Sequence, residues 1–433
     1  MVAHLALLFA LLSPLASSPR TAPAPTTPQG PDAKEQRALL AEWVALGPRA
    51  MSAERERQQE ILARFGELPA PDERDLARVE KELAALVADL PGLPKGSGRQ
   101  FLEPKEKRGL YLVGGKSRSP KGLFVGLHGG GVGEGDAEEA RGNWESAAAA
   151  QGWLAIFPEV LVKTEHGWTD SGTEEFVLEL IERALRTHKL PPDRVFLAGH
   201  SMGGYGAWTV GARHADRFAG LVASAGAPTP LLGADRRPKG VDWGVVPNLR
   251  NTRMVVFQSS DDPQVTPDAN RVAAKEVAAA KERWGGYPFE YWEVDGNGHA
   301  LPPGGAKELL DKVADARRVA RPERVVWQPV LTWKRQFHWL FWETPPAGAV
   351  IDASVDRAAG RIEIRAEPHA GGLGVLVGPE LVDVERELVV LVNGEERFRG
   401  VPQPSYGAVL ETAIWGDPEL LYRMRIALDR KGP

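Results

Sequence analysis

The sequence predicts an α/β fold built on a mostly parallel sheet, with a helical segment before it and a small β-sandwich-like domain after it. Three observations predict this class. Apolar residues recur at helical spacing between residues 34 and 90. Short β-rich runs alternate with helical patterns from 99 to 322, which indicates a sheet covered on both faces. From 323 onward short alternating strands take over.

Composition excludes several classes of function. The chain has 433 residues, which suggests two or three domains. Its net charge of −5 gives no reason to expect a nucleic acid partner. There are no cysteines, so disulfides, thiol catalysis and thiolate-bound metals are excluded. The nine histidines form no His-Glu-x-x-His pair, which argues against a zinc hydrolase, and we expect no metal or other cofactor.

The amino terminus resembles an export signal. A continuous apolar run, Leu5–Leu12, precedes small residues that suit a signal peptidase. The run is too short to span a bilayer, which takes about 20 apolar residues. We therefore predict a signal peptide at 1–18, a disordered Pro-rich linker at 19–33, no membrane span, and a secreted or periplasmic protein. A cytoplasmic protein with an apolar start is the alternative, because no Lys or Arg precedes the run.

A helical N-terminal segment is predicted over 34–98. Pro71-Asp72 is a start signal for one helix, and Gly47-Pro48 is a stop signal for an earlier one. We interpret the apolar stripes of both helices as packing faces: Leu39, Leu40, Trp43, Val44, Leu76, Val79, Leu83, Leu86, Val87 and Leu90. The stretch Gly92–Gly98 is predicted to be a hinge or linker.

Seven short runs are the predicted strands of a catalytic domain over 99–322: Leu110–Val113, Leu123–Leu127, Trp153–Phe157, Val195–Ala198, Gly220–Ser224, Met254–Gln258 and Phe289–Val294. The clearest helix between them is Glu174–Arg186. Ser171 and Glu174 have the spacing of a capping box at its start.

The β-rich C-terminal domain is predicted over 323–433. Its strongest signal is Asn393-Gly394 between Leu388–Val392 and Glu395–Phe398, which is typical of a β-hairpin. The stretch 327–342 holds four tryptophans. We interpret it as a seam between the two domains; exposed aromatics that stack on sugar rings or a polyester chain are the alternative.

The chemistry centres on the pentapeptide Gly199-His200-Ser201-Met202-Gly203. An apolar strand precedes it and a helical pattern follows, so Ser201 is predicted to occupy the sharp turn called a nucleophile elbow. Such a turn holds its serine in strained dihedrals and leaves no room for side chains at the flanking glycines. The serine hydroxyl is then exposed at the carboxyl edge of the sheet, suited to attack on a carbonyl carbon.

A serine hydroxyl needs a neighbouring base, and the base needs an orienting acid. Met254–Gln258 runs into Asp261 and Asp262; we favour Asp262 as the acid and expect Asp261 to brace the turn. The next strand is followed by a glycine-rich loop that ends at His299, the predicted general base.

An oxyanion hole is expected from two backbone N–H groups. One is that of Met202, directly after the nucleophile. The other lies in His128-Gly129-Gly130-Gly131, which follows a buried strand; we favour Gly130, with Gly129 as the nearest alternative.

On these residues the chain resembles the α/β-hydrolase superfamily. The matching pieces are Leu127–Gly131, Asp193–Gly204, Asp262-Pro263 and Gly298-His299, within about 99–322. Inside the superfamily it looks like exported esterases related to polyhydroxybutyrate depolymerases and feruloyl or acetylxylan esterases, and like prolyl-oligopeptidase-type peptidases. The resemblance implies Ser201 as nucleophile, Asp262 as acid and His299 as base. The chain departs from the secreted depolymerases in lacking their cysteines.

Three functions remain open. The first is a serine esterase that forms an acyl-enzyme at Ser201 and cleaves a small-molecule or polymeric ester. The second is a prolyl-oligopeptidase-like peptidase, although no propeller-blade repeat is present. The third is a surface binding protein with a vestigial catalytic domain. Trp168 and His200 are the candidate substrate-binding residues; His200 and His128 are expected to hydrogen-bond locally. The sequence does not give the oligomeric state.

Overall fold

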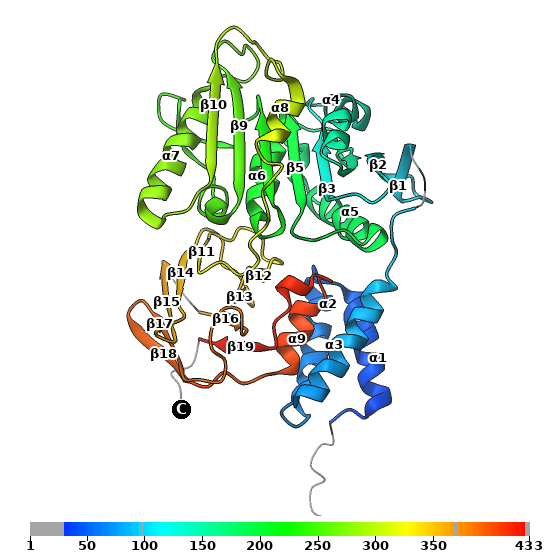
Figure 1. Cartoon of the computed structure of the whole chain (residues 1–433), viewed down its shortest axis with the longest axis vertical. Coiled ribbons are helices and arrows are strands. Elements are labelled where there is room, and N and C mark those ends of the chain that lie inside the picture. The colour runs from blue at the N-terminus through cyan, green and yellow to red at the C-terminus, as the bar shows by residue number, and fades with distance from the viewer. Residues whose placement is uncertain (1–29, 95, 97, 368–370, 429–433) are drawn as a thin grey trace, which may run out of the picture.

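The computed structural model describes residues 30–94, 96, 98–367 and 371–428, so the predicted signal peptide and most of the predicted linker lie outside it. A large sheet with its helices forms one body, and a helical bundle beside two smaller sheets forms the other (Figure 1). Within these ranges, no helix has the length and apolar character needed to cross a membrane.

The large sheet has eight strands in the order β1-β2-β4-β3-β5-β6-β9-β10. β1 and β2 run antiparallel to their neighbours and the other six strands are parallel. The strands are β1 (Gly98–Glu103), β2 (Arg108–Gly115), β3 (Leu123–Leu127), β4 (Leu154–Pro158), β5 (Val195–His200), β6 (Gly220–Ser224), β9 (Arg253–Ser259) and β10 (Phe289–Val294). All seven predicted strands are present, and this is the predicted α/β-hydrolase fold.

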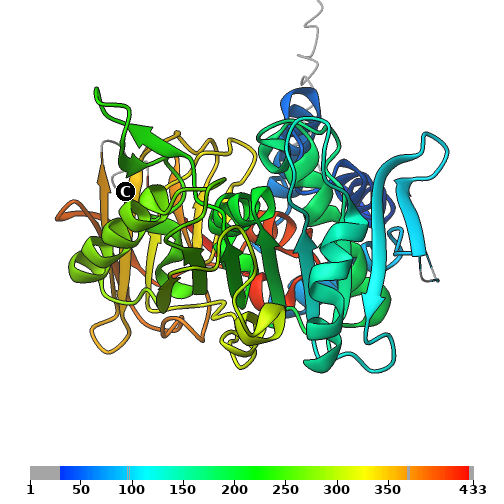
Figure 2. The ribbon, with the colours of Figure 1, turned by 90° about the horizontal axis from the view of Figure 1, so that it is seen from above.

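Helices cover both faces of the sheet, as Figure 2 shows from above. One face packs on α4 (Ala137–Ala150) and α8 (Gly305–Asp311), around Trp144 and Leu309. The other packs on α5 (Thr173–His188), α6 (Met202–Arg213) and α7 (Asp268–Trp284). The central strands β3, β4 and β6 are therefore buried along their whole length, which explains their unbroken apolar runs.

The predicted capping box of α5 is wrong. The helix starts at Thr173, and its N-cap is Gly172 in a left-handed conformation with no side-chain hydrogen bond to the cap. Glu174 instead is buried and binds Arg213 and His214, at 2.9 Å and 2.8 Å. The Glu174 carboxylate therefore forms tertiary ion pairs, instead of the local hydrogen bond that the sequence pattern predicts at the helix start.

Two smaller sheets share one core in the C-terminal part. Their orders are β11-β14-β15-β17-β18 and β12-β13-β16-β19. The β17–β18 hairpin turns at Asn393 and Gly394, with φ of 52° and 82°, as predicted. The strands are β11 (Arg324–Trp327), β12 (Gln336–Phe337), β13 (Leu340–Trp342), β14 (Val350–Asp356), β15 (Arg361–Glu367), β16 (Leu373–Val377), β17 (Leu388–Val392), β18 (Glu395–Gly400) and β19 (Met424–Ala427).

The tryptophans of 327–342 lie in the interior rather than on an open face. Trp327, Trp339 and Trp342 are almost completely buried, and Trp333 is 7% exposed. The indole of Trp333 donates to Glu175 on α5, at 3.1 Å. The Trp333 contact agrees with the seam interpretation, whereas Trp327, Trp339 and Trp342 belong to the core of the C-terminal sheets.

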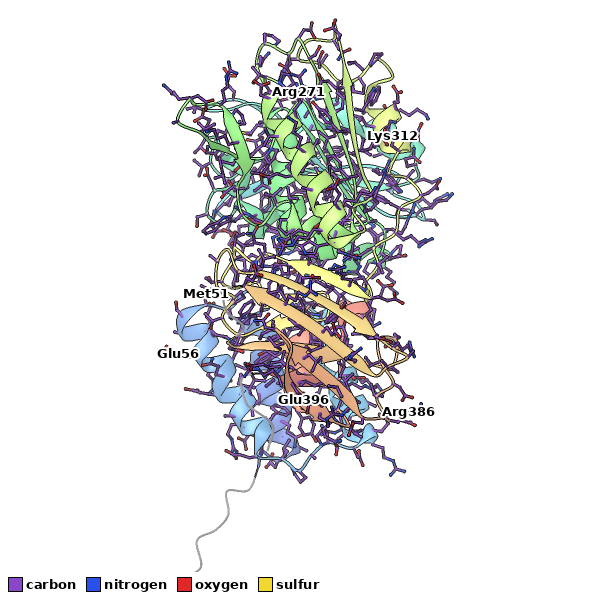
Figure 3. All side chains as sticks on the ribbon, turned by 90° about the vertical axis from the view of Figure 1, so that its left-hand side faces the viewer. Met51, Glu56, Arg271, Lys312, Arg386 and Glu396 are labelled. Carbon is purple, nitrogen blue, oxygen red and sulfur yellow. The ribbon has the colours of Figure 1, made fainter. Side chains whose placement is uncertain are left out.

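The N-terminal helices α1 (Ala33–Leu46), α2 (Ser52–Gly66) and α3 (Glu73–Ala88) pack around a helix from the other end of the chain. This helix, α9 (Tyr406–Ala413), lies in the segment predicted to be only β-rich. Its Leu410 carbonyl accepts from the Trp43 indole at 2.9 Å. In the side view of Figure 3, Met51 and Glu56 lie on the same lower body as Arg386 and Glu396, whereas Arg271 and Lys312 lie on the upper one.

Short elements complete the part of the chain that the structure describes. A two-stranded hairpin, β7 (Pro230–Leu232) and β8 (Pro238–Val241), follows β6. Four 3-10 turns are η1 (Gly167–Thr169), η2 (Ala215–Arg217), η3 (Pro247–Asn251) and η4 (Pro418–Leu420).

Candidate active site

Ser201 occupies a strained turn between β5 and α6. Its φ is 57° and its ψ is −124°, a conformation that residues other than glycine rarely adopt. The turn is held by the Ser201 amide, which donates to the Ser224 carbonyl at 2.9 Å, and by the Tyr205 amide, which donates to the Ser201 carbonyl at 3.1 Å. The hydroxyl is thus presented at the carboxyl end of β5, where helix α6 begins.

Glycines allow this turn because the backbones around it touch. A Cβ at Gly199 would lie 2.0 Å from the Gly203 carbonyl oxygen, and one at Gly203 would lie 2.3 Å from that of Leu127. A Cβ at Gly226, after β6, would lie 2.2 Å from the Ser201 carbonyl oxygen. The first two positions are those of the Gly-x-Ser-x-Gly motif, and the third was not singled out from the sequence.

The structure brings Ser201, His299 and Asp262 into one hydrogen-bonded series. His299 Nε2 lies 2.9 Å from Ser201 Oγ, and His299 Nδ1 lies 2.8 Å from Asp262 Oδ2. Each residue follows the end of a parallel strand, β5, β9 or β10, and these ends share one edge of the sheet. The ring can therefore donate to the carboxylate through Nδ1 and accept from the hydroxyl through Nε2.

Asp262 is buried, and both of its carboxylate oxygens accept hydrogen bonds. Its Oδ1 accepts from the amides of Gln264 and Val265, both at 2.9 Å. Burial alone would raise the pKa of this carboxyl, but hydrogen bonds from His299 and from these two amides outweigh burial and lower the pKa. Asp262 is therefore a carboxylate at neutral pH and can stabilise a positive charge on the imidazole.

A buried polar relay behind Asp262 was missed from the sequence. Gln258 donates from its Nε2 to Asp262 Oδ2 at 3.3 Å and to the Val265 carbonyl at 2.9 Å. Asn270 on α7 donates to Gln258 Oε1 at 2.8 Å. The Trp208 indole, on α6, donates to Asn270 Oδ1 at 3.1 Å. A single glutamine inside an apolar strand, Met254–Gln258, was the one signal that could have indicated it.

Asp261 holds the histidine loop rather than the histidine. Its Oδ1 accepts from the amides of Asn297 and Gly298, at 3.1 Å and 3.0 Å, and from the Ser259 hydroxyl. The Asn297 side chain in turn donates to the Leu301 carbonyl at 3.0 Å. This bracing role agrees with the expectation for Asp261.

The glycine-rich loop after β3 lies against the nucleophile. A Cβ at Gly129 would lie 3.3 Å from Ser201 Cβ, so this loop approaches the serine closely. Burial raises the pKa of the Glu139 carboxyl beside this loop. The candidate oxyanion donors are the amide of Gly130, whose φ is 113°, with that of Gly129 as the alternative, and the amide of Met202 at the start of α6.

His128 supports this loop as a neutral residue. The Val160 amide donates to its Nε2 at 3.2 Å, so Nδ1 carries the hydrogen and donates to the Gly129 carbonyl at 2.6 Å. Burial lowers the pKa of His128. The ring is thus a structural brace, as expected.

The expectation that Trp168 binds substrate requires correction. The side chain is fully buried, and its indole donates to the His128 carbonyl at 3.2 Å. Its ring would touch a Cβ at Gly206 of α6, at 2.7 Å. Trp168 therefore packs under the glycine-rich loop after β3, out of reach of a ligand above Ser201.

His200 lies at the edge of the sheet that carries Ser201 and His299. Its Nδ1 is 3.2 Å from Ser224 Oγ, and its ring centroid is 4.9 Å from that of His299. Burial is the main cause that lowers the pKa of His200 to about 4, and the nearby His299 adds to it. His200 is consequently neutral at neutral pH and can face a substrate only as a polar, uncharged group.

Among the residues that the structure describes, no three His, Asp or Glu side chains gather in a way that could hold a metal ion. The hydrogen-bonded series of Ser201, His299 and Asp262 is the arrangement at this edge that can do chemistry, namely nucleophilic attack assisted by proton transfer.

No family model and no curated protein matches the chain. Solved structures are similar over about half of it. A thermostable esterase is 21% identical to this chain. The match covers 46% of this chain and 54% of the esterase, with a TM-score of 0.35. Esterase 2 of Thermogutta terrifontis is 14% identical. The match covers 52% of this chain and 94% of that esterase, with a TM-score of 0.39. A ferulic acid esterase from the anaerobic fungus Anaeromyces mucronatus is 17% identical. The match covers 51% of this chain and 89% of that esterase, with a TM-score of 0.37. The match to the thermostable esterase thus spans about half of that protein.

Proposed function

We propose that this chain hydrolyses carboxylic esters through a covalent acyl-enzyme at Ser201, with Asp262 and His299 as the other members of a catalytic triad. The observation that carries the proposal is the unbroken hydrogen-bonded series from Ser201 Oγ through both ring nitrogens of His299 to Asp262 Oδ2, at 2.9 Å and 2.8 Å. The strained elbow that presents the serine supports the same reading.

In the first step Ser201 Oγ attacks the ester carbonyl carbon while its proton passes to His299 Nε2. The tetrahedral oxyanion is stabilised by the backbone N–H groups of Gly130 and Met202. Asp262 stabilises the imidazolium through its hydrogen bond with Nδ1. Nε2 then protonates the departing alkoxide, so that the alcohol leaves and the acyl group remains bonded to Oγ.

In the second step water attacks the acyl carbon and gives one proton to His299 Nε2. The second tetrahedral intermediate collapses, the bond between the acyl carbon and Ser201 Oγ breaks, and the proton returns to Oγ. The carboxylic acid leaves as the second product. His200, neutral beside Ser201, offers the substrate a polar, uncharged group.

The substrate is a small-molecule or polymeric ester reached outside the cytoplasm, because the apolar run at the amino terminus is interpreted as a signal peptide. Domain boundaries near residues 98 and 322 stay predictions. Export also stays a prediction.

The test uses p-nitrophenyl acetate and butyrate with the full chain and with Ser201→Ala. We expect turnover by the parent protein and a loss of roughly 10³-fold or more in the variant. Ser171→Ala, a change at an exposed serine outside the site, serves as the control and retains full turnover. A fluorophosphonate should label the parent protein and Ser171→Ala, but not Ser201→Ala.

Two results would change the proposal. Cleavage of X-Pro amides without cleavage of esters would identify a peptidase. A folded protein that turns over neither substrate class and resists the fluorophosphonate would be a binding protein with a vestigial catalytic domain.

A further inference from the structure

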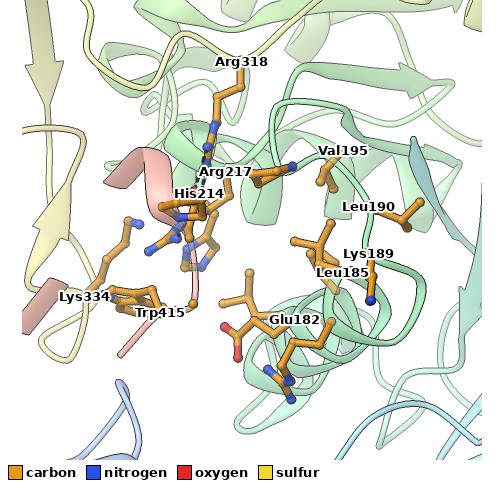
Figure 4. Close-up of a pocket in the computed structure, with 17 residues that line it drawn as sticks. Glu182, Leu185, Lys189, Leu190, Val195, His214, Arg217, Arg318, Lys334 and Trp415 are labelled. Atoms are coloured by element: carbon orange, nitrogen blue, oxygen red, sulfur yellow. Dashed lines mark hydrogen bonds and ion pairs between the residues drawn. The ribbon is translucent and has the colours of Figure 1, made fainter. Parts of the chain in front are cut away.

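A cavity of about 280 Å³ lies between the two bodies of the molecule (Figure 4), and its lining does not include the elbow residues. Val195, in its wall, begins β5, and Ser201 follows the end of the same strand. Six residues at about 3.3 Å each put the cavity about 20 Å from the serine, at the opposite edge of the sheet. The cavity is therefore separate from the candidate active site.

One side of the cavity is apolar. Leu178, Ile181 and Leu185 come from one stripe of α5, and Leu190 from the loop after it. In Figure 4, Leu185, Leu190 and Val195 face Trp415 across the open space. Trp415 belongs to the segment after α9, so the walls are contributed by both bodies. An apolar chain placed here would be shielded from water on two sides.

A guanidinium with incomplete partners lies in the same cavity. Arg217 stacks on Trp415, with its Cζ 4.3 Å from the ring centroid. Its Nε is 3.6 Å from Asp216 Oδ2, and its Nη1 is 3.7 Å from Asp417 Oδ2, both beyond hydrogen-bonding distance. Its Nη2 is buried and has no hydrogen-bond partner. Among the described residues, stacking and these two longer ion pairs hold the guanidinium, and its planar fork suits the paired hydrogen bonds of a carboxylate.

Cationic side chains outnumber acids in the same lining. Arg186, Lys189, Arg318 and Lys334 lie there with Arg217, against the two acids Glu182 and Asp417. These acids are already bound, because Asp417 pairs with Arg318 and Glu182 with Arg49. The lining therefore carries a net positive charge, which favours an anionic ligand over a neutral or cationic one.

We propose that this cavity binds a small amphiphilic carboxylate. The carboxylate group accepts hydrogen bonds from Arg217, and its aliphatic or aryl body lies between the apolar stripe of α5 and Trp415. Lys189, exposed at the rim of the cavity, marks the entrance. The ligand bridges the two bodies, so its binding stabilises their packing. The proposal does not depend on ester hydrolysis at Ser201.

The test is calorimetric titration of the full chain with sodium octanoate, and with 1-octanol and sodium acetate as analogues that lack the charge or the chain. We expect saturable binding of octanoate that is at least about tenfold tighter than that of either analogue. Arg217→Gln should weaken octanoate binding by roughly tenfold or more. Leu185→Trp, which fills the apolar side, should weaken octanoate and octanol alike.

The matched control is Arg253→Gln, which removes a half-buried arginine paired with Glu290 away from the cavity and should bind octanoate as the parent does. Should Arg217→Gln fail to fold, Arg217→Lys and Leu185→Trp carry the test. Absence of saturable binding, equal affinity for 1-octanol, or octanoate affinity unchanged by both cavity variants would overturn the proposal. The last result would also indicate octanoate bound as a product near Ser201.

Discussion

Asp261 and Asp262 hold the same loop by different atoms. Asp262 Oδ2 binds the ring of His299 at 2.8 Å, whereas Asp261 Oδ1 binds the amide of the preceding residue, Gly298, at 3.0 Å. One carboxylate thus contacts the imidazole and the other fixes the backbone that carries it. Two adjacent acids have separable roles, which a pair of conservative changes can distinguish.

Asp262→Asn should lower kcat for p-nitrophenyl acetate by roughly 10²–10⁴-fold, because an amide can neither stabilise the imidazolium nor hold the ring in the required tautomer. Asp261→Asn should lower kcat by only about tenfold or less, because its amide oxygen still accepts from the loop amides. Steady-state kinetics on both variants measure this. Equal losses would mean that Asp262 acts only by bracing the loop.

The glycines of the elbow should tolerate no side chain. Gly199→Ala puts a Cβ 2.0 Å from the Gly203 carbonyl oxygen, and we expect a loss of more than about 3 kcal/mol in the free energy of unfolding. Gly142→Ala, inside α4 with open space around it, should be neutral or stabilise by up to about 1 kcal/mol. Denaturant unfolding of both variants measures this; a stable Gly199→Ala protein would contradict the close packing described for β5 and α6.

Acid should weaken the contact between the two bodies at Asp216. Burial alone would raise the pKa of this carboxyl, but attraction from Lys334 and Arg217 outweighs burial and lowers the pKa from 3.8 to about 2. Because the folded state favours the carboxylate, its contribution to stability is complete above about pH 4 and is lost as pH falls through 2.

Thermal unfolding between pH 6 and pH 2 measures this contribution. Asp216→Asn should have a lower Tm than the parent at pH 6, and the difference should shrink as the pH falls from 4 to 2. A constant difference across this range would show that Asp216 is not ionised in the folded protein.

Trp168→Phe should affect stability rather than substrate binding. The change removes the indole N–H that binds the His128 carbonyl and leaves a gap beside Gly206. We expect a loss of about 1–3 kcal/mol in the free energy of unfolding, with KM for p-nitrophenyl butyrate changed by less than about threefold. A tenfold rise in KM at unchanged stability would restore Trp168 as a substrate contact.

The parts of the fold predicted from sequence are those with strong local signals. β3 and β4 are continuous apolar runs because both faces are buried, and the hairpin at Asn393 has a turn that requires positive φ. β1 was missed: Gly98 falls in the predicted linker and no strand was predicted over the rest, because none of its six residues is buried. Such an edge strand has neither an apolar run nor a clear alternation.

Other features depend on partners that are distant in sequence. Helix α9 was missed because its apolar face, with Val409 and Leu410, packs on helices from the opposite end of the chain. Gln258 and Asn270 form no motif and become informative only when β9 and α7 lie side by side. Trp168 was assigned to the pocket from its aromatic character alone, which cannot distinguish a buried ring from an open one.

Because α9 packs on the apolar face of the N-terminal helices, it also limits the order in which the chain can fold during synthesis. Trp43 and its acceptor Leu410 are 367 residues apart. At about 5–20 residues per second, the ribosome needs on the order of 20–70 s to add the residues between them. Until then the first helices carry an uncovered apolar face, Leu40 and Ile61 included. Any chaperone that handles the nascent chain will meet this face first, and a truncated product would retain it permanently.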